Sequence, residues 1–337
     1  MAMRLGIVIP CYNEDEVLPE TSRRITELLS RLAALGKISP DSQVYLVDDG
    51  SSDGTWRLIE ALVAADRRIV GVKLSRNRGH QTALIAGLFT ADGDAVISID
   101  ADLQDDINVI EQMVDRFRNG DEIVYGVRKQ RQGDTLLKRV TAETFYRVLR
   151  SLGAESIYNH ADYRLLSRRA IECLKAYREV NLYLRGIIPL IGFRSSVVLY
   201  DRGNRFAGKS KYPLRRMIGL ALNAVTSFSI VPLRLITLAG FVIFAGSMAV
   251  TVWVLWVRFF SRNAVPGWAS IVLPLYFLGG LQLFCIGMLG EYLGKTYAEV
   301  KARPRFFIER IESQASEQRP HGMAAAPTEK SAGGLRT

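Results

Sequence analysis

The chain has 337 residues, 48% of them hydrophobic, and its 44 Lys and Arg against 34 Asp and Glu give a net charge of +10. This length allows one large domain or two smaller ones, and the composition excludes a wholly disordered chain and a fibre. Three scattered cysteines without C-x-x-C spacing argue against a disulfide framework and a structural zinc site. The apolar run at the N-terminus is too short for a signal peptide, so we expect the N-terminal part to stay in the cytoplasm.

Short β-rich runs alternate with helical patterns from Arg4 to about Val127. The strands are predicted at 5–10, 43–49, 69–75, 94–100 and 122–127, and the helices at 14–35, 55–65, 80–90 and 106–118. Repeated β-α units predict an α/β domain with a mainly parallel, doubly wound, Rossmann-like sheet. In such sheets ligands bind beyond the carboxyl ends of the strands.

Polar clusters follow three of these strands. They are the strings PCYNE (10–14), DDGSSDG (48–54) and DADLQ (100–104). Neither a G-x-G-x-x-G loop nor a P-loop is present, so we expect neither a dinucleotide oxidoreductase nor a P-loop NTPase. Asp102 and Gln104, with Asp100 beside them, offer oxygen ligands that suit Mg²⁺ or Mn²⁺. A lone D-x-D is a weak signal because Asp also lines turns, but its strand-end position in register with Asp48 and Asp49 strengthens it.

Two long uncharged stretches, 235–257 and 269–290, dominate the C-terminal part. Each is long enough to cross about 30 Å of hydrocarbon, which predicts two transmembrane helices; the alternative is a pair of buried core helices. Basic residues flank the outer ends, whereas the connection holds only Arg258 and Arg262, so we expect both termini in the cytoplasm. The predicted organisation is an α/β domain (1–211), an amphipathic interfacial segment (212–234), a transmembrane hairpin (235–293), a cytoplasmic juxtamembrane segment (294–310) and a disordered tail (311–337).

The strings VIPCYNE, VDDGSSDGT and DADLQD resemble those of the inverting family 2 glycosyltransferases, which have the GT-A fold. Later strings at 125–128 (YGVR), 161–165 (ADYRL), 205–213 (RFAGKSKYP) and 290–294 (GEYLG) are similar to those of the polyprenyl-phosphate glycosyltransferases. That group contains bactoprenol glucosyltransferases, the undecaprenyl-phosphate aminoarabinose transferase and dolichyl-phosphate mannose synthases. The resemblance covers about Arg4 to Arg310. It implies a metal-dependent enzyme, using Mg²⁺ or Mn²⁺, that moves one sugar with inversion from a nucleotide diphosphate sugar to a membrane polyprenyl phosphate.

The resemblance also implies roles for individual residues. The nucleotide side is assigned to Pro10, Tyr12, Asn13, Glu14, Asp48, Asp49 and Ser51. The metal is assigned to Asp102 and Gln104 together with Asp100, which also faces the donor. Arg128 and Arg131 fall where the group places contacts to the acceptor phosphate, and Arg128 is counted with Asp100 and Asp162 among the catalytic residues. Arg205, Ser210 and Lys211 match its phosphate-binding loop, and Lys138 is a further substrate-binding candidate. Asp162 matches the motif acid of the group. Because the acceptor phosphate already carries about −1.5 to −2 charges at pH 7, we interpret Asp162 as an orienting group first and a general base second. For Arg131 and Lys138 the alternative is snorkelling at the membrane surface.

The sequence leaves the donor open. UDP-glucose with undecaprenyl phosphate is the first expectation, and GDP-mannose or a UDP-aminoarabinose-type donor is the alternative. Two departures from the group, Arg78 and Asp106-Ile107, lie near the expected donor pocket, and His80 is expected either to contact substrate or to pack at a helix start. A non-catalytic nucleotide-sugar-binding partner of a flippase is the competing class. A plasma-membrane location, contact with membrane lipids and no nucleic-acid partner are expected, and a homo-oligomer stays open.

Overall fold

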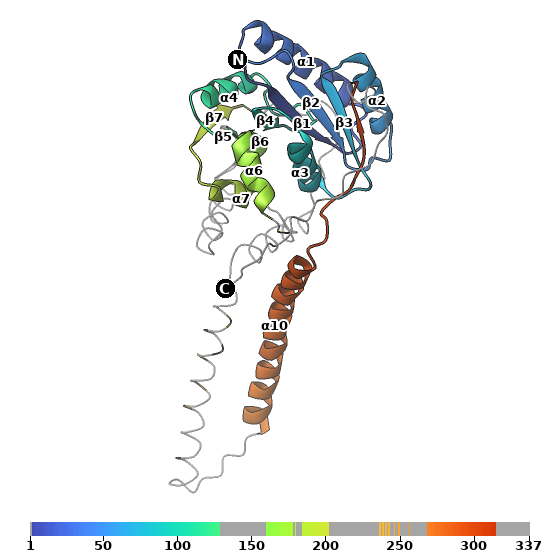
Figure 1. Cartoon of the computed structure of the whole chain (residues 1–337). Coiled ribbons are helices and arrows are strands. Elements are labelled where there is room, and N and C mark those ends of the chain that lie inside the picture. The colour runs from blue at the N-terminus through green and yellow to red at the C-terminus, as the bar shows by residue number, and fades with distance from the viewer. Residues whose placement is uncertain are drawn as a thin grey trace, which may run out of the picture.

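The computed structural model describes residues 2–128, 160–177, 179, 184–201 and 268–314, together with isolated positions between 236 and 256. Its centre is an eight-stranded sheet with the strand order β7-β5-β6-β4-β1-β2-β3-β8 (Figure 1). The strands are β1 (Leu5–Cys11), β2 (Gln43–Asp48), β3 (Ile69–Leu74), β4 (Ala95–Ser98), β5 (Ile123–Arg128), β6 (His160–Ser167), β7 (Ser195–Tyr200) and β8 (Ile308–Glu312). The helices are α1 (Leu18–Ala34), α2 (Thr55–Ala65), α3 (His80–Thr90), α4 (Val109–Arg118), α6 (Arg168–Ala176), α7 (Leu184–Leu190) and α10 (Trp268–Lys301).

The first four strands form a parallel block in which β1 lies between β2 and β4. The chain therefore reverses its direction of travel across the sheet after β3, and the switch point lies beside β1, where an open α/β sheet offers its ligand crevice. This arrangement confirms the predicted mainly parallel α/β fold. The predicted ranges of α2 and α3 agree with the structure at both ends.

Antiparallel pairing occurs at two places in the sheet, at β6 and at β8. Strand β6 runs antiparallel between β4 and β5, and its Arg164 lies opposite Ser98 of β4. Because β6 runs the opposite way, its first residues lie beside the carboxyl end of β4. Asp162 is thereby brought to the edge of the sheet where the polar clusters end. Sequence patterning did not predict β6, β7 or β8.

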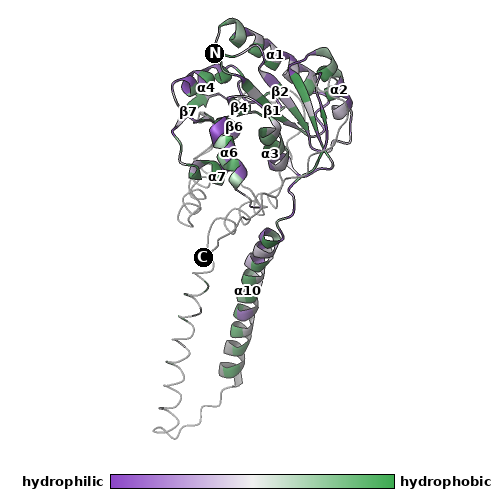
Figure 2. Ribbon diagram, in the orientation of Figure 1, coloured by the Kyte–Doolittle hydropathy of each residue, from purple (hydrophilic) through white to green (hydrophobic). Residues whose placement is uncertain are grey.

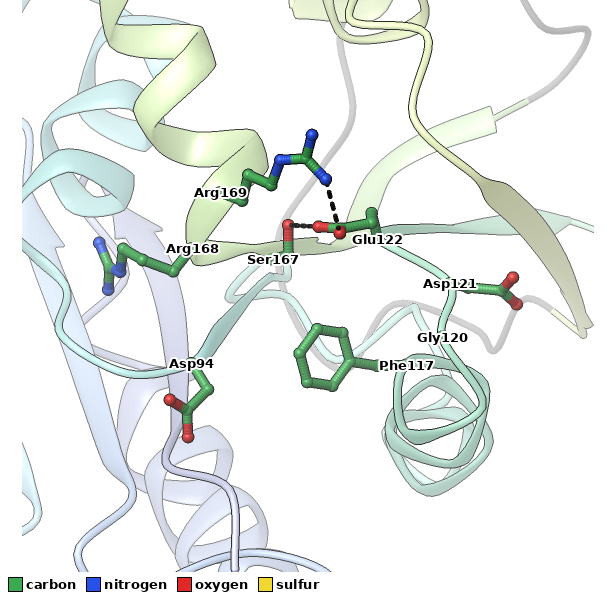
Figure 3. A pocket seen from close by; sticks show the side chains of 8 residues that line it. All are labelled: Asp94, Phe117, Gly120, Asp121, Glu122, Ser167, Arg168 and Arg169. Atoms are coloured by element: carbon green, nitrogen blue, oxygen red, sulfur yellow. Dashed lines mark hydrogen bonds and ion pairs between the residues drawn. The ribbon is translucent and has the colours of Figure 1, made fainter.

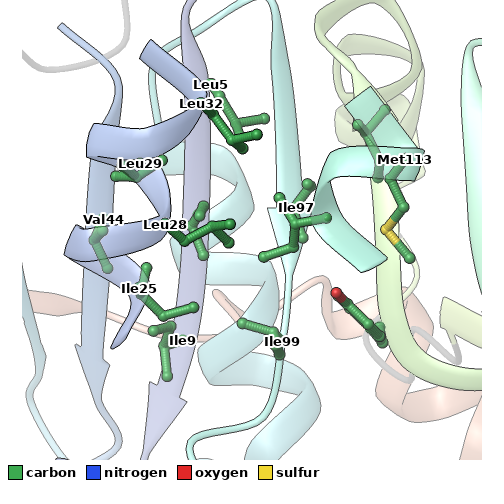
Figure 4. Packing of buried hydrophobic residues seen from close by; sticks show 14 of the residues in the cluster. Leu5, Ile9, Ile25, Leu28, Leu29, Leu32, Val44, Ile97, Ile99 and Met113 are labelled. Carbon is green, nitrogen blue, oxygen red and sulfur yellow. The ribbon is translucent and has the colours of Figure 1, made fainter. Parts of the chain in front are cut away.

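Two apolar layers hold the sheet between helices. Residues of α1, α2 and α4 join one buried cluster and residues of α3, α6 and α7 the other. Figure 4 shows the first layer, in which Ile25, Leu28, Leu29 and Leu32 of α1 face the strands. Their spacing of three, four and seven places them on one face of the helix. On the other face of the sheet, Gly87 lets α3 approach β1 closely, because a Cβ at this position would lie 2.3 Å from Cγ1 of Val8.

The C-terminal part ends on the sheet. After α10 the chain adds β8 antiparallel to β3, with Gly71 opposite Glu312. This strand continues past residue 310, where the tail was predicted to begin. Figure 2 shows mostly hydrophobic residues along α10, with the hydrophilic ones mainly in the part that leads to the sheet.

The predicted membrane region is not supported by the structure. Within the ranges that the structure describes, no helix is long and apolar enough to cross a membrane. The second predicted span falls within α10. The segment 212–234 and nearly all of 235–257 lie outside the described residues.

Candidate active site

The loops after β1, β2 and β4 meet at the carboxyl edge of the sheet, because these three strands are parallel neighbours. Backbone strain is concentrated in two of these loops. Asn13 has φ 54° and Leu103 has φ 55°, and leucine rarely adopts this left-handed conformation. Such strain persists where the surrounding structure enforces it, which is common at ligand sites.

The loops after β1 and β2 hold one another through side-chain caps. The backbone N–H of Asn13 donates to Oγ of Ser51 over 3.0 Å, and Oδ1 of Asn13 accepts from the N–H of Ser52 over 2.9 Å. Asp48 is fully buried and accepts from the N–H of Ser51, and its burial raises the pKa of the carboxyl. Asp48 therefore supports the turn from inside the protein. Tyr12, in contrast, is about half exposed at the edge of the sheet and is open to a ligand.

Two further residues predicted for the nucleotide side frame this loop. Pro10 is buried within β1. Glu14 is partly exposed, and its N–H donates to Oγ1 of Thr55 over 2.9 Å. The structure thus brings together all the residues predicted for the nucleotide side, but Pro10 and Asp48 are buried and support the loops from within.

Asp49 connects β2 to the turn before α3. Its two carboxylate oxygens accept the backbone N–H groups of Arg78 (2.7 Å) and Gly79 (2.8 Å). Burial raises the pKa of Asp49, and these two hydrogen bonds counteract the rise. Gly79 has φ 89°, a conformation that suits glycine. Nε of Arg78 is buried and has no hydrogen-bond partner within the described chain, so it is a donor that a ligand can satisfy.

Asp100 follows β4 and contacts His80, the first residue of α3. Nε2 of His80 lies 2.9 Å from Oδ1 of Asp100, and both side chains are partly exposed. Partial burial acts to lower the pKa of His80, but the hydrogen bond to Asp100 and the charges of Asp100 and Asp162 outweigh it and raise the pKa. Two residues further on, Oδ1 of Asp102 accepts the N–H of Gln104 over 3.2 Å.

Asp162 is held by two arginines. Arg164 contacts Oδ1 of Asp162, and Arg185 contacts both oxygens, with Nη2 3.1 Å from Oδ2. Burial acts to raise the pKa of Asp162, but the two guanidinium groups outweigh it and lower the pKa to about 2. Arg164 is fully buried, which lowers its own pKa, and its Nε and Nη1 have no partner among the residues described. Asp162 therefore stays ionised at neutral pH.

Arg128 is engaged inside the protein. Its Nε donates to the hydroxyl oxygen of Tyr200 over 3.0 Å, and its Nη2 lies 3.2 Å from Oδ1 of Asp105. The Tyr200 hydroxyl donates to the same carboxylate oxygen over 2.5 Å. This cluster ties the loop after β4 to the ends of β5 and β7. Phosphate binding by Arg128, as predicted from the sequence, would compete with these contacts.

Comparisons with known proteins identify the family of this chain. Residues 6–175 match the model of a family described as Glycosyl transferase family 2. The chain belongs to glycosyl transferase family 2. It is 50% identical over 307 residues to "Uncharacterized glycosyltransferase YkoT" of Bacillus subtilis (strain 168), which covers 90% of this chain and 91% of that protein. It is 38% identical over 313 residues to "Prophage bactoprenol glucosyl transferase homolog" of Escherichia coli (strain K12), with 92% and 99% covered.

Solved structures give a weaker likeness. Glucosyl-3-phosphoglycerate synthase from Mycobacterium tuberculosis, crystallised with Mn²⁺, UDP and phosphoglyceric acid, is 18% identical. It covers 66% of this chain and 76% of its own, with a TM-score of 0.45. A likeness of this size assigns no role to any residue of the site.

The oxygen ligands of this family 2 glycosyltransferase suit a divalent metal. In the part of the chain that is described, no group of three or more His, Cys, Asp or Glu side chains forms a ready metal site. Mg²⁺ usually takes one or two protein carboxylates and completes its shell with water and substrate phosphates. Asp100 and Asp102, with Gln104 on the strained loop, provide a donor set of that kind.

Five predicted site residues of the glycosyltransferase lie outside the described residues: Arg131, Lys138, Arg205, Ser210 and Lys211. Sequence reasoning missed Asp105, Arg164, Arg185 and Tyr200. Asp105 and Arg164 lie within the strings DADLQD and ADYRL, and this position was the available signal. Arg185 and Tyr200 lie beyond the range of the family match, in segments without a motif.

A pocket of about 330 Å³ lies at the opposite edge of the sheet (Figure 3). Its charged groups already have partners. Glu122 accepts from Ser167 over 2.5 Å and pairs with Arg169, and Arg168 donates to two backbone carbonyls. These charged side chains are therefore already paired, and the carboxyl edge of the sheet is the candidate site.

Proposed function

We propose that this glycosyltransferase transfers a single glucose from UDP-glucose to undecaprenyl phosphate, with inversion and with help from Mg²⁺ or Mn²⁺. One observation carries the proposal: the 38% identity to a protein named as a bactoprenol glucosyl transferase homolog extends over 92% of this chain. Relatives from Shigella phages with the name bactoprenol glucosyl transferase are also 38% identical over 91% of the chain.

The chemistry of the edge supports a phosphate nucleophile. A phosphate monoester is already ionised at neutral pH, so the enzyme needs no strong base. An oxygen of the acceptor phosphate attacks the anomeric carbon, the bond from that carbon to the donor phosphate oxygen breaks, and UDP leaves with the bonding electrons. Asp162, with a pKa of about 2 and two arginine partners, is a poor proton acceptor and suits an orienting role.

The protein must bring two anions together, and this requirement defines the roles of its charged side chains. A bound Mg²⁺ or Mn²⁺ would neutralise the developing charge on the leaving diphosphate. Asp102, Gln104 and Asp100 would hold it. Arg185 is partly exposed beside Asp162, and its guanidinium would help to position the phosphates at this edge. Positioning of this kind is a main source of acceleration.

The proposal includes a plasma-membrane location, with the sheet and both ends of the chain on the cytoplasmic side. A polyprenyl phosphate is anchored in the membrane, and the basic residues that flank 235–290 would favour anionic lipid. Exposed apolar side chains of α10 add to this support: Ile271, Leu275, Ile286, Leu289, Leu293 and Val300.

A labelling experiment tests this location. With the native cysteines replaced by serine, a cysteine introduced as Ser30→Cys on the exposed side of α1 should react with a membrane-impermeant maleimide in lysed cells and not in intact cells. The protein should also float with vesicles in a density gradient. Labelling in intact cells would reject the cytoplasmic placement, and failure to float would reject membrane binding.

A panel of radiolabelled donors tests the function itself. Purified protein is incubated with undecaprenyl phosphate and labelled UDP-glucose, GDP-mannose or UDP-aminoarabinose analogue, and label entering the lipid phase is counted. Labelled glucose should enter the lipid phase. The configuration at its anomeric carbon, determined on the product, should be inverted relative to UDP-glucose. Mannose or aminoarabinose transfer would establish one of the alternatives, and no lipid label with any donor would favour the non-catalytic flippase partner.

Metal dependence is a separate prediction. Asp102→Asn should lower transfer by at least about a hundredfold, because metal stabilisation of leaving charge contributes several kcal/mol. EDTA should abolish transfer, and Mg²⁺ or Mn²⁺ should restore it. Full activity in EDTA, with no divalent ion detected in the protein, would contradict the prediction.

A further inference from the structure

The three-residue segment Arg78–His80 contacts the loops that follow two different strands. At one end, Asp49 after β2 accepts the N–H groups of Arg78 and Gly79 over 2.7 and 2.8 Å. At the other end, Nε2 of His80 lies 2.9 Å from Asp100 after β4. Because β2 and β4 lie on either side of β1, this short turn connects the loops on both sides of the end of β1.

The turn is fixed by several independent contacts. Asp49 is only 2% exposed, so its grip on the turn is shielded from water. The left-handed conformation of Gly79 sets the direction in which α3 starts. Helix α3 is then seated closely on β1 and β2 through Gly87. His80 is therefore presented from a rigid base.

Asp100, in contrast, needs a partner to define its orientation. About 35% of its side chain is exposed, and a carboxylate in such a place samples several rotamers unless it is hydrogen bonded. The charged groups that face His80 are Asp100, Asp162 and Arg185. Arg185 and the fully buried Arg164 both contact Asp162, whereas the side chain of Asp100 contacts the His80 imidazole, so His80 is placed to orient Asp100.

We propose that His80 is a positioning residue that fixes the Asp100 carboxylate for the metal and sugar end of the donor, on a turn that Asp49 anchors at the nucleotide end. The inference rests on the proposed donor-binding function. It deepens that function, because the two ends of the donor site are joined through one turn. Ligand carboxylates that lose such an outer hydrogen bond typically lose 10- to 100-fold in metal affinity or activity.

The test measures binding of UDP to the full-length protein by calorimetry, with and without Mn²⁺, and transfer to undecaprenyl phosphate. In His80→Ala, UDP binding with Mn²⁺ and the turnover number should fall about 10- to 100-fold. Binding of UDP alone should be unchanged, because Asp49 holds the turn through backbone groups. His80→Gln, whose Nε2 can donate to Asp100, should recover most of the loss, and the neighbouring Gln81→Ala is the matched control.

Two results would overturn the inference. One is a His80→Ala variant that binds UDP with Mn²⁺ and turns over like the wild type. The other is a His80→Gln variant as impaired as His80→Ala, which would mean that the ring itself contacts the substrate. Circular dichroism checks that each variant is folded. If the wild type binds UDP with Mn²⁺ but labels no lipid, the proposed transfer is refuted, and the binding comparison still tests the role of His80. If the wild type binds neither UDP nor Mn²⁺, the proposed transfer and the role of His80 are both refuted.

Discussion

The neighbours of Asp162 change the role that its side chain can have. As a motif acid it is a candidate base, but contact with Arg164 and Arg185 holds its pKa at about 2. An ideal general base has a pKa near the working pH. The carboxylate instead compensates a fully buried guanidinium, whose charge would otherwise be costly to bury.

Replacing Asp162 by Asn should therefore destabilise the protein strongly. Breaking a buried ion pair by removing one partner costs about 3–5 kcal/mol, because the other charge stays buried without compensation. Urea unfolding at pH 7 measures the difference. Asp66→Asn is the control, since the Asp66–Arg68 pair is one-quarter exposed and should contribute about 1 kcal/mol or less. Equal losses in the two variants would contradict the buried-pair interpretation.

The same ion pair predicts a pH dependence. The folded pKa of Asp162, about 2, lies below its ordinary value of 3.8, so the contribution is present above about pH 4 and is lost as the pH falls toward 2. The difference in unfolding free energy between the wild type and Asp162→Asn should shrink across this window. A difference that stays constant from pH 5 to about pH 2 would show that Asp162 does not carry the charge that stabilises Arg164.

The network of Asp105, Arg128 and Tyr200 makes a related prediction. Tyr200→Phe removes the hydroxyl that donates to Asp105 and accepts from Arg128, so it should cost about 1–3 kcal/mol of unfolding free energy. Tyr297→Phe, on an exposed position of α10, should change little. A double-mutant cycle with Arg128→Lys should give a coupling energy of about 0.5–3 kcal/mol. Additive effects would mean that the Arg128 fork serves another partner.

At the scale of elements, the close seating of α3 on the sheet depends on Gly87. A Cβ at this position would meet Cγ1 of Val8 at 2.3 Å and Cγ2 of Val47 at 2.8 Å, both buried side chains. Gly87→Ala should cost about 1–3 kcal/mol through overpacking, although alanine favours helices. Gly287→Ala on α10, where the added carbon meets no atom within 4 Å, should be neutral or stabilising by up to about 1 kcal/mol. Equal stability of Gly87→Ala and the wild type would contradict this packing.

Local pattern predicted the elements of the parallel block well, because each is specified by its own residues. Helix α2 begins after Gly54 and α3 after Gly79, and the predicted ends of both helices agree with the structure. Strand β6 was missed because its place depends on pairing with β4 and β5 across a long connection. Its buried Arg164 also breaks the expectation that arginine lies outside, and the contact with Asp162 compensates its charge.

For the site, the rule that ligands bind beyond the carboxyl ends of parallel strands correctly predicted that Asp49, Asp100 and Asp102 share one edge of the sheet. The rule could not assign their partners, since hydrogen bonds from Arg78, Gly79 and His80 arise from a turn between other elements. It also could not predict that Asp48 and Asp49 are both buried, with Asp48 supporting the loop after β2 and Asp49 holding the turn before α3. Sequence position identifies candidates, and packing decides which of them can meet a substrate.

At the scale of the whole molecule, the last described strand fastens α10 to the sheet. Strand β8 covers the edge of β3, and Lys73 pairs with Glu309 at 3.0 Å across the two strands. Before the strand, Arg305 donates to the carbonyl of Tyr177, and after it Gln314 donates to the carbonyls of Val63 and Ala64. The sheet edge and the orientation of α10 therefore depend on the same short segment.

Removing β8 should have two linked consequences. A chain truncated after Pro304 loses the strand and leaves the backbone groups of β3 unpaired, and exposed strand edges of this kind favour association. It should unfold at lower urea concentration than the full chain and should aggregate on purification. A chain truncated after Gln314 keeps every contact of β8 and is the matched control, so its stability should equal that of the full chain. If the shorter truncation were as stable and monodisperse as this control, β8 would be dispensable and α10 would be held to the sheet by other contacts.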